Sequence, residues 1–143
     1  MKVSIFIDKN REEEIQIFAH NESDLTEQIK SLVSDYSSHV TGYKNAEIFL
    51  LKTTDVYCFL VENNKVFAMT ENDKFLLKER LYNIENSLSF DFIKINKSCI
   101  ANIKKIERFD ASISGTLVVK FKNGYTDYVS RRSVKTVKER LSL

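Results

Sequence analysis

The sequence contains little of what nucleotide-binding and membrane proteins need. Its 143 residues include no proline, three glycines and two cysteines. The glycines, at positions 42, 115 and 124, are too widely spaced for either glycine-rich loop that binds nucleotide phosphates. The longest apolar run, residues 48–51, is far shorter than the roughly 18 residues of a membrane-spanning helix. These absences predict a compact chain with short turns and no membrane insertion.

Histidine and cysteine are too sparse for a metal centre or a catalytic nucleophile. Both histidines, His20 and His39, lie in the N-terminal part, and neither Cys58 nor Cys99 belongs to a CxxC pair. The cysteines lie in apolar, strand-like segments, which favours buried thiols in a reducing cytoplasm. Residues 1–8 alternate between polar and apolar side chains, unlike the apolar block of a signal peptide. We therefore expect a cytoplasmic protein that is not an enzyme and uses no cofactor or metal.

The net charge of +2 conceals an asymmetry along the chain. Residues 87–143 contain 12 Lys or Arg against 5 Asp or Glu, a net charge of +7, whereas residues 1–86 contain 10 against 15, a net charge of −5. A basic C-terminal part indicates a polyanionic partner, either nucleic acid or an acidic protein surface. Charge alone does not distinguish these two partners.

The first 42 residues predict a strand–strand–helix unit. Apolar side chains alternate over residues 3–7 and again over 15–17, which is typical of two strands, and the polar residues 9–13 connect them. Residues 24–36 then have helical spacing with one apolar face, and Ser23 and Asp24 offer capping oxygens. A polar break over residues 37–45 marks the boundary with a second domain, residues 43–143.

The second domain is predicted to be mainly β, which makes the whole chain an α+β protein. Strand patterns cover residues 46–51, 56–61, 66–70, 90–95 and 100–106 and a hairpin at 117–129, and helical spacing covers 74–87 and the residues after Ser130. Asn123-Gly124 lies between two alternating strands. This pair predicts a type I′ hairpin turn, in which both central residues need a positive φ.

Two segments of the basic part place cationic and amide side chains at strand ends. They are residues 92–106, which contain Asn96, Lys97 and Ser98, and residues 123–135, which contain Ser130, Arg131 and Arg132. Lys and Arg can bind guanine or phosphate and Asn can bind adenine, so such side chains beyond a sheet suit a DNA groove. The alternative is that Ser130 only caps a helix and that the lysine and arginines are solvated charges.

These two segments resemble the LytTR DNA-binding domain of bacterial transcription regulators. Residues 92–106 match the family pattern F-[IV]-[RK]-[IV]-[HN]-[RK]-S-x-[IV]-[VA]-N-[IL]-x-x-I. Residues 123–132 match the N-G hairpin and the following V-S-R-[RK], and the resemblance extends over about residues 43–143. It implies an elongated arrangement of small antiparallel sheets with short helices. Such a domain reads DNA through loops and strand ends instead of a helix-turn-helix.

The resemblance also implies which side chains face DNA. The family's DNA-facing positions fall on Lys97, on Arg132 and, in the turn before the 66–70 strand, on Asn64 or Lys65. The candidate set is completed by Asn96, Ser98, Ser130, Arg131 and, as a phosphate contact beside the hairpin tip, Lys122. The chain departs from the family at Asn96, where histidine is frequent.

The resulting hypothesis is a stand-alone regulator that binds double-stranded DNA sequence-specifically as a homodimer. Residues 1–42 are too few for a receiver domain, and we expect them to act as a dimerisation or regulatory element. The resemblance also implies control by a neighbouring membrane protein as an inhibitory partner. Two alternatives stay open: a protein–protein adaptor whose basic face binds an acidic partner, and a ligand-sensing domain with a pocket in the N-terminal unit.

Overall fold

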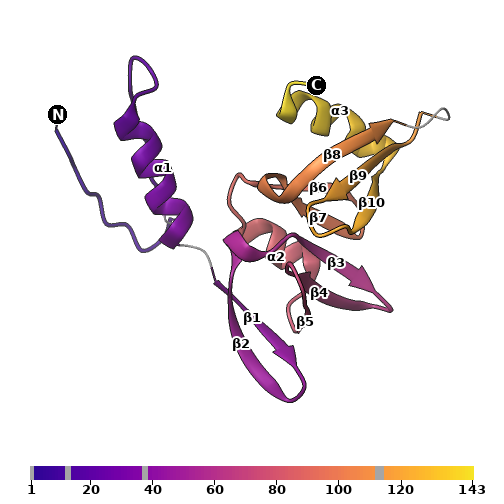
Figure 1. Ribbon diagram of the computed structural model, residues 1–143. Coiled ribbons are helices and arrows are strands. Elements are labelled where there is room, and N and C mark those ends of the chain that lie inside the picture. Colours follow the sequence, from indigo (N-terminus) through magenta and orange to yellow (C-terminus); the bar gives the residue numbers. More distant parts are fainter. Residues whose placement is uncertain (1, 12–13, 37–38, 112–114) are drawn as a thin grey trace. The chain divides into compact units, whose positions relative to one another are not determined.

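The computed structural model describes residues 2–11, 14–36, 39–111 and 115–143 (Figure 1). They divide into two compact units, residues 1–33 and residues 34–143. Helix α1 spans Asp24–Tyr36, as the apolar spacing predicts, and most of it belongs to the first unit. Its start is capped reciprocally: Thr26 N donates to Ser23 Oγ at 3.3 Å, and Ser23 N donates to Thr26 Oγ1 at 2.9 Å. Two amides at the start of the helix are thereby satisfied.

The two N-terminal strands predicted from alternation are wrong for the residues that the structure describes. Residues 2–11 and 14–23 contain no strand, and Val3, Ile5 and Ile7 are more than 80% exposed. An isolated two-stranded hairpin is at best marginally stable in water, because it has no second layer against which to bury its apolar face. Alternation alone therefore does not produce a strand here.

Seven antiparallel strands form the larger sheet of the second unit, in the order β2-β1-β5-β4-β3-β7-β6. The strands are β1 (His39–Lys44), β2 (Glu47–Lys52), β3 (Cys58–Glu62), β4 (Lys65–Met69), β5 (Lys74–Leu77), β6 (Phe92–Asn96) and β7 (Cys99–Asn102). A 3-10 turn, Thr53–Asp55, precedes β3, and helix α2, Leu81–Ser87, lies between β5 and β6.

A smaller antiparallel sheet follows, in the order β10-β9-β8. It consists of β8 (Ile106–Ala111), β9 (Leu117–Phe121) and β10 (Thr126–Val129), preceded by a 3-10 turn at Ile103–Lys105 and followed by helix α3, Arg131–Leu141. Figure 1 shows β8, β9 and β10 beside β6 and β7, with α3 at the C-terminal end. The described second unit is thus mainly antiparallel β with two short helices, as predicted.

Two apolar clusters hold this unit together. One joins the two sheets and α3, and its fully buried members include Cys58, Cys99, Val119, Phe121 and Val137. The other lies under α2 and includes Phe59, Ala68, Ile84 and Ile100. Burial of such side chains contributes roughly 1.5–3 kcal/mol for each large one. The first cluster fixes β6, β10 and α3 against one another.

Three further predictions are corrected by the tertiary structure. The first half of the predicted helix 74–87 is strand β5, which pairs with β4 from Lys74 to Leu77. The predicted polar break over 37–45 contains β1 instead. Residues 103–105 form a 3-10 turn, and β8 follows it as a strand that the sequence pattern did not reveal. For β1, β5 and β8, pairing with a neighbouring strand outweighs the local sequence pattern.

Gly42 shows why β1 belongs to the folded sheet. A Cβ at this position would lie 2.8 Å from Leu51 Cδ1 and 2.8 Å from Phe75 Cβ, closer than carbon atoms can approach. The glycine therefore allows β1 to pack between β2 and β5, and it does not mark a linker.

Candidate nucleic-acid interface

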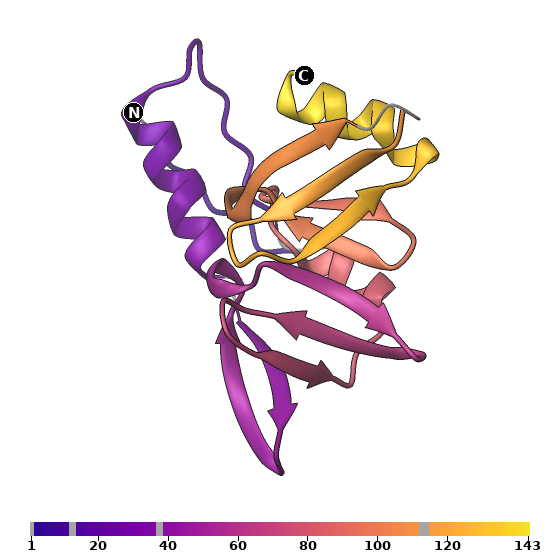
Figure 2. The ribbon, with the colours of Figure 1, turned by 45° about the vertical axis from the view of Figure 1, so that its right-hand side comes forward.

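Three segments that carry predicted DNA-facing residues meet along one edge of the second unit. The amide of Val61, at the end of β3, donates to Ser98 O of the β6–β7 turn at 2.9 Å. The amide of Ser130, which precedes α3, donates to Ile95 O at 2.8 Å. In Figure 2 the β3–β4 turn, the β6–β7 turn and the start of α3 follow one another along the right-hand edge. The fold therefore assembles one surface from residues 61–65, 95–98 and 130–132.

The cations of this edge are exposed and uncommitted. Lys65, Lys97, Arg131 and Arg132 are all exposed, and none of them forms an ion pair with another of the described residues. Other lysines differ. Lys94 Nζ lies 3.5 Å from Glu85 Oε2. Lys104 Nζ, in the 3-10 turn, lies 3.2 Å from Asp91 Oδ2. The edge cations are consequently available for phosphate or base contacts.

Asn96 is part of the interior of this edge and has no free amide. Its side chain is 2% exposed, and Nδ2 donates to Asp127 Oδ1 at 3.0 Å and to Tyr128 O at 2.9 Å. Its Oδ1 accepts from Ser98 N at 2.8 Å. These bonds use both amide hydrogens, so the expectation of a direct Asn96 base contact is corrected. The side chain instead holds the β6–β7 turn against β10.

The two serines of the candidate set are half-buried. Ser98 contributes its backbone, since its amide donates to Asn96 and its carbonyl accepts from Val61. Ser130 occupies the N-cap position of α3, but its hydroxyl donates to Ser133 Oγ at 3.0 Å instead of accepting from a backbone amide. Both serines are therefore placed to shape the edge.

The β3–β4 turn has the geometry of a tight hairpin. Asn63 and Asn64 have φ values of +50° and +61°, which is the left-handed region that asparagine tolerates better than most residues. Asn64 is exposed at the tip, and the exposed Lys65 begins β4 beside it. The positive φ at position 64 favours asparagine there for conformational reasons. The Asn64 side chain is nevertheless exposed and accessible to a ligand.

Lys122 is not brought to this edge. It lies in the β9–β10 turn, where its amide donates to Lys105 O at 3.0 Å. The neighbouring Asn123 donates from Nδ2 to Thr70 O at 3.1 Å, beyond the end of β4 opposite to Lys65. In this turn only Gly124 has a positive φ, +90°, so the predicted type I′ turn is wrong. Its Gly124 N–Phe121 O bond and left-handed glycine are typical of a three-residue hairpin loop.

The charged residues of the 3-10 turn also differ from expectation. Lys104 and Lys105 do not alternate along a strand. Lys104 pairs with Asp91, and Lys105 Nζ lies 5.2 Å from the centre of the Tyr57 ring. Both therefore already have partners within the described fold.

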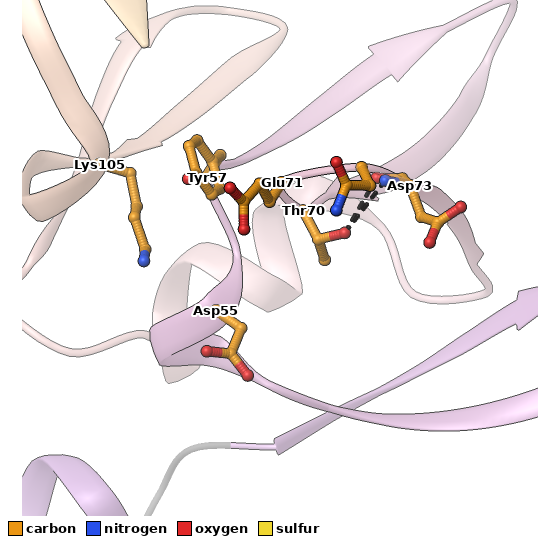
Figure 3. Close-up of a pocket in the computed structure, with 7 residues that line it drawn as sticks. Asp55, Tyr57, Thr70, Glu71, Asp73 and Lys105 are labelled. Atoms are coloured by element: carbon orange, nitrogen blue, oxygen red, sulfur yellow. Dashed lines mark hydrogen bonds between the residues drawn. The ribbon is translucent and has the colours of Figure 1, made fainter. Parts of the chain in front are cut away.

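A shallow hollow of about 170 Å³ lies near Lys105, and Figure 3 shows its lining. The lining residues are Asp55, Tyr57, Thr70, Glu71, Asn72, Asp73 and Lys105. Three carboxylates against one lysine would repel phosphate, so this hollow does not extend the candidate DNA surface. All its residues belong to the second unit, so it is not the N-terminal pocket of the ligand-sensing alternative.

Asp127 is a residue of the edge that the sequence reasoning missed. Its Oδ1 accepts from Asn96 Nδ2 and, at 2.8 Å, from Tyr128 N, and its Oδ2 accepts from Tyr125 at 3.2 Å. No local signal marks it, because an aspartate after a hairpin is usually a solvated charge. Only the packing of β10 against β6 reveals its partners.

Comparison with known proteins decides the family. Residues 46–142 match the family model of the LytTr DNA-binding domain. The chain belongs to the LytTR family. The resemblance inferred from residues 92–106 and 123–132 is thus confirmed, and the function of this LytTR chain is DNA-binding regulation.

Relatives and a solved structure agree with this LytTR assignment. Two uncharacterized HTH-type transcriptional regulators of Staphylococcus aureus, strains NCTC 8325 / PS 47 and COL, are 40% identical over 146 residues, covering 100% of this chain and 99% of each relative. The solved LytTr DNA-binding domain from Bacillus cereus superposes with a TM-score of 0.70 at 20% identity, covering 74% of this chain and 98% of that one. The likeness to this structure confirms the fold.

The helices of the LytTR chain do not form a helix-turn-helix. Strands separate α1, α2 and α3 throughout the described residues, so no two helices are consecutive. The term in the relatives' names therefore does not describe the architecture seen here. None of the described helices has the length and apolar character to cross a bilayer.

Proposed function

We propose that this LytTR chain binds specific sequences in double-stranded DNA and reads them through the edge formed by residues 61–65, 95–98 and 130–132. The observation that carries the proposal is the convergence of Lys65, Lys97, Arg131 and Arg132 on that edge: all four are exposed, and none forms an ion pair with the part of the chain that the structure describes. Glu62, which lies in the segment 61–65, is paired with Lys74, whose Nζ is 2.6 Å from Glu62 Oε2. The unpaired positive charge of the edge therefore suits the phosphates and base edges of double-stranded DNA.

The four cations have different roles in this proposal. Arg132 reads a base, because its planar guanidinium can donate two parallel hydrogen bonds to one guanine. Lys97, at the tip of the β6–β7 turn, reaches a base edge or a phosphate. Arg131 and Lys65 neutralise phosphates on either side. Phosphate contacts position the protein and base contacts provide the discrimination.

The test is the dependence of affinity on salt and on sequence. A binding site is first selected from random duplexes, and its affinity is then measured by fluorescence anisotropy from low to moderate salt. Neutralising about 4–6 phosphates gives a slope of log K against log salt of roughly −4 to −5. A flat salt response, or equal affinity for the selected and scrambled duplexes, contradicts the proposal.

A second proposal assigns the N-terminal residues 1–42 to self-association, so that the regulator binds paired sites as a homodimer. Its support is the exposure of apolar side chains in the first unit: Phe6 and Phe18 are more than 90% exposed and Leu32 is 70% exposed. A second copy with the same apolar side chains would remove this surface from water. Sedimentation of the full chain at tens of micromolar tests it. A monomer that still binds paired sites with the affinity of single sites contradicts it.

A further inference from the structure

The turn that presents Lys97 differs from the other two-residue turns of the sheet. Asn45 and Ala46 in the β1–β2 turn, like the pair in the β3–β4 turn, have positive φ values, which match the twist of the flanking strands. Neither Lys97 nor Ser98 has a positive φ, although Asn96 pairs directly with Cys99 across their turn. Two-residue turns of this kind splay their strands and need support from outside the hairpin.

That support comes from a bulge and a side chain. The register shifts between Lys94 and Asn96, which leaves Ile95 as an extra residue whose carbonyl accepts from Ser130. The Asn96 side chain spans the gap between the turn and β10, because it accepts from Ser98 and donates to Asp127. Asp127 is itself fixed by bonds from Tyr128 N and from the hydroxyl of Tyr125.

We propose that Asp127 is a positioning residue for DNA recognition, which acts through Asn96 to hold the Lys97 turn at a set distance from the start of α3. The inference rests on the proposed function of this edge and adds a determinant of its specificity. Asp127 acts from within the protein, because both of its carboxylate oxygens already accept hydrogen bonds from Asn96, Tyr125 and Tyr128. Its negative charge lowers the affinity of the edge for DNA of any sequence. In return, it fixes the Lys97 turn, which increases the difference in affinity between the preferred sequence and other sequences.

Two measurements on the full chain test this role, one without DNA. The amide of Ser98, which donates to Asn96, reports on the turn through its hydrogen exchange. Asp127→Ala is expected to speed exchange at Ser98 about tenfold relative to amides of β4. Asp110→Ala is the matched control, because Asp110 lies in the same small sheet and pairs with Arg108 at 3.0 Å without contacting Asn96.

The second measurement is the ratio of affinities for selected and scrambled duplexes. Asp127→Ala and Asn96→Ala are each expected to lower this ratio about fivefold to tenfold, and the double variant no further, because both remove one linkage. Asp127→Asn keeps an oxygen that can accept from Asn96. This variant should keep most of the ratio while binding both duplexes more tightly, and it also serves if the alanine variant does not fold.

The outcomes separate this inference from the proposed function. Unchanged exchange at Ser98 in Asp127→Ala, or ratio losses that add in the double variant, overturns the role of Asp127. A wild-type chain that does not distinguish the duplexes overturns the proposed function instead, and exchange at Ser98 then still decides whether Asp127 positions the turn.

Discussion

Asn123 in the β9–β10 turn donates from Nδ2 to the carbonyl oxygen of Thr70, 3.1 Å away, and so ties the small sheet to the end of β4 in the large sheet. Its Oδ1 accepts from Tyr125 N at 3.0 Å, which also shapes its own turn. One asparagine thus supports the hairpin and the packing of two sheets. This junction lies at the opposite end of the unit from the proposed DNA edge.

Replacing Asn123 by alanine should lower stability without changing DNA recognition. The substitution removes two hydrogen bonds and leaves Thr70 O without this donor, which costs about 1–3 kcal/mol. Urea unfolding measures the loss, and anisotropy on the selected duplex should show unchanged affinity for the folded variant. A loss of affinity greater than the loss of folded protein would contradict the separation of the two ends.

Gly42→Ala should destabilise the β1–β2 hairpin. The Phe75 Cβ that an alanine would meet at 2.8 Å is attached to the backbone of β5 and cannot rotate away. Overpacking of this kind typically costs about 1–3 kcal/mol. Thermal unfolding provides the measurement, with Thr41→Ala as the control because Thr41 is an exposed neighbour in β1. Equal unfolding temperatures of the two variants would show that β1 and β5 can move apart to accept the extra methyl group without loss of stability.

Arg132→Ala should reduce affinity for the selected duplex by about 1–3 kcal/mol and affinity for scrambled DNA by much less. The reason is that a guanidinium fork to guanine is lost only where guanine is in place. The matched control is Lys138→Ala, since Lys138 is exposed on α3 outside the three segments of the edge. Equal losses on both duplexes would make Arg132 a phosphate contact and not a base reader.

Lys122 and Lys65 provide a test of which end of the unit meets DNA. Both are exposed lysines beside hairpin tips, but only Lys65 lies on the proposed edge. Lys65→Ala should reduce the salt slope by about one, as expected for one lost phosphate contact. Lys122→Ala should leave the slope unchanged. A reduced slope for Lys122→Ala and an unchanged slope for Lys65→Ala would show that DNA binds instead at the end of the unit that carries Asn123.

Alkaline pH should destabilise the fold through Tyr125. Burial raises the pKa of the Tyr125 phenol above its usual value of 10.0, and the nearby Asp127 carboxylate raises it further. The unfolded chain therefore loses this proton first, so the contribution is complete below about pH 10 and is lost as pH rises above it. Tyr125→Phe should flatten the fall in stability above pH 10, whereas Tyr82→Phe, at a 70% exposed position, should not. An unchanged pH profile in Tyr125→Phe contradicts this origin.

Local sequence was sufficient wherever an element's pattern and its environment agree. The apolar spacing of residues 24–36 predicted α1, and Ser130 followed by Val134, Val137 and Leu141 predicted α3. The alternation in residues 117–129 predicted the β9–β10 hairpin. Short-range spacing also marked the basic segments around Lys97 and Arg132, because their residue types follow one another in the chain.

Only the tertiary structure decided the elements and side chains whose partners are distant in sequence. Leu77 has spacing that suits a helix, but pairing with Val66 makes it part of a strand. Residues 3–7 alternate like a strand and, in the described structure, find no partner with which to form one. Asn96 resembled a surface amide until Asp127, 31 residues later, made it an internal bridge. Hydrogen bonds and burial depend on which segments pack against one another. The local sequence pattern indicates the secondary structure that each segment favours, but it does not indicate which other segment it contacts.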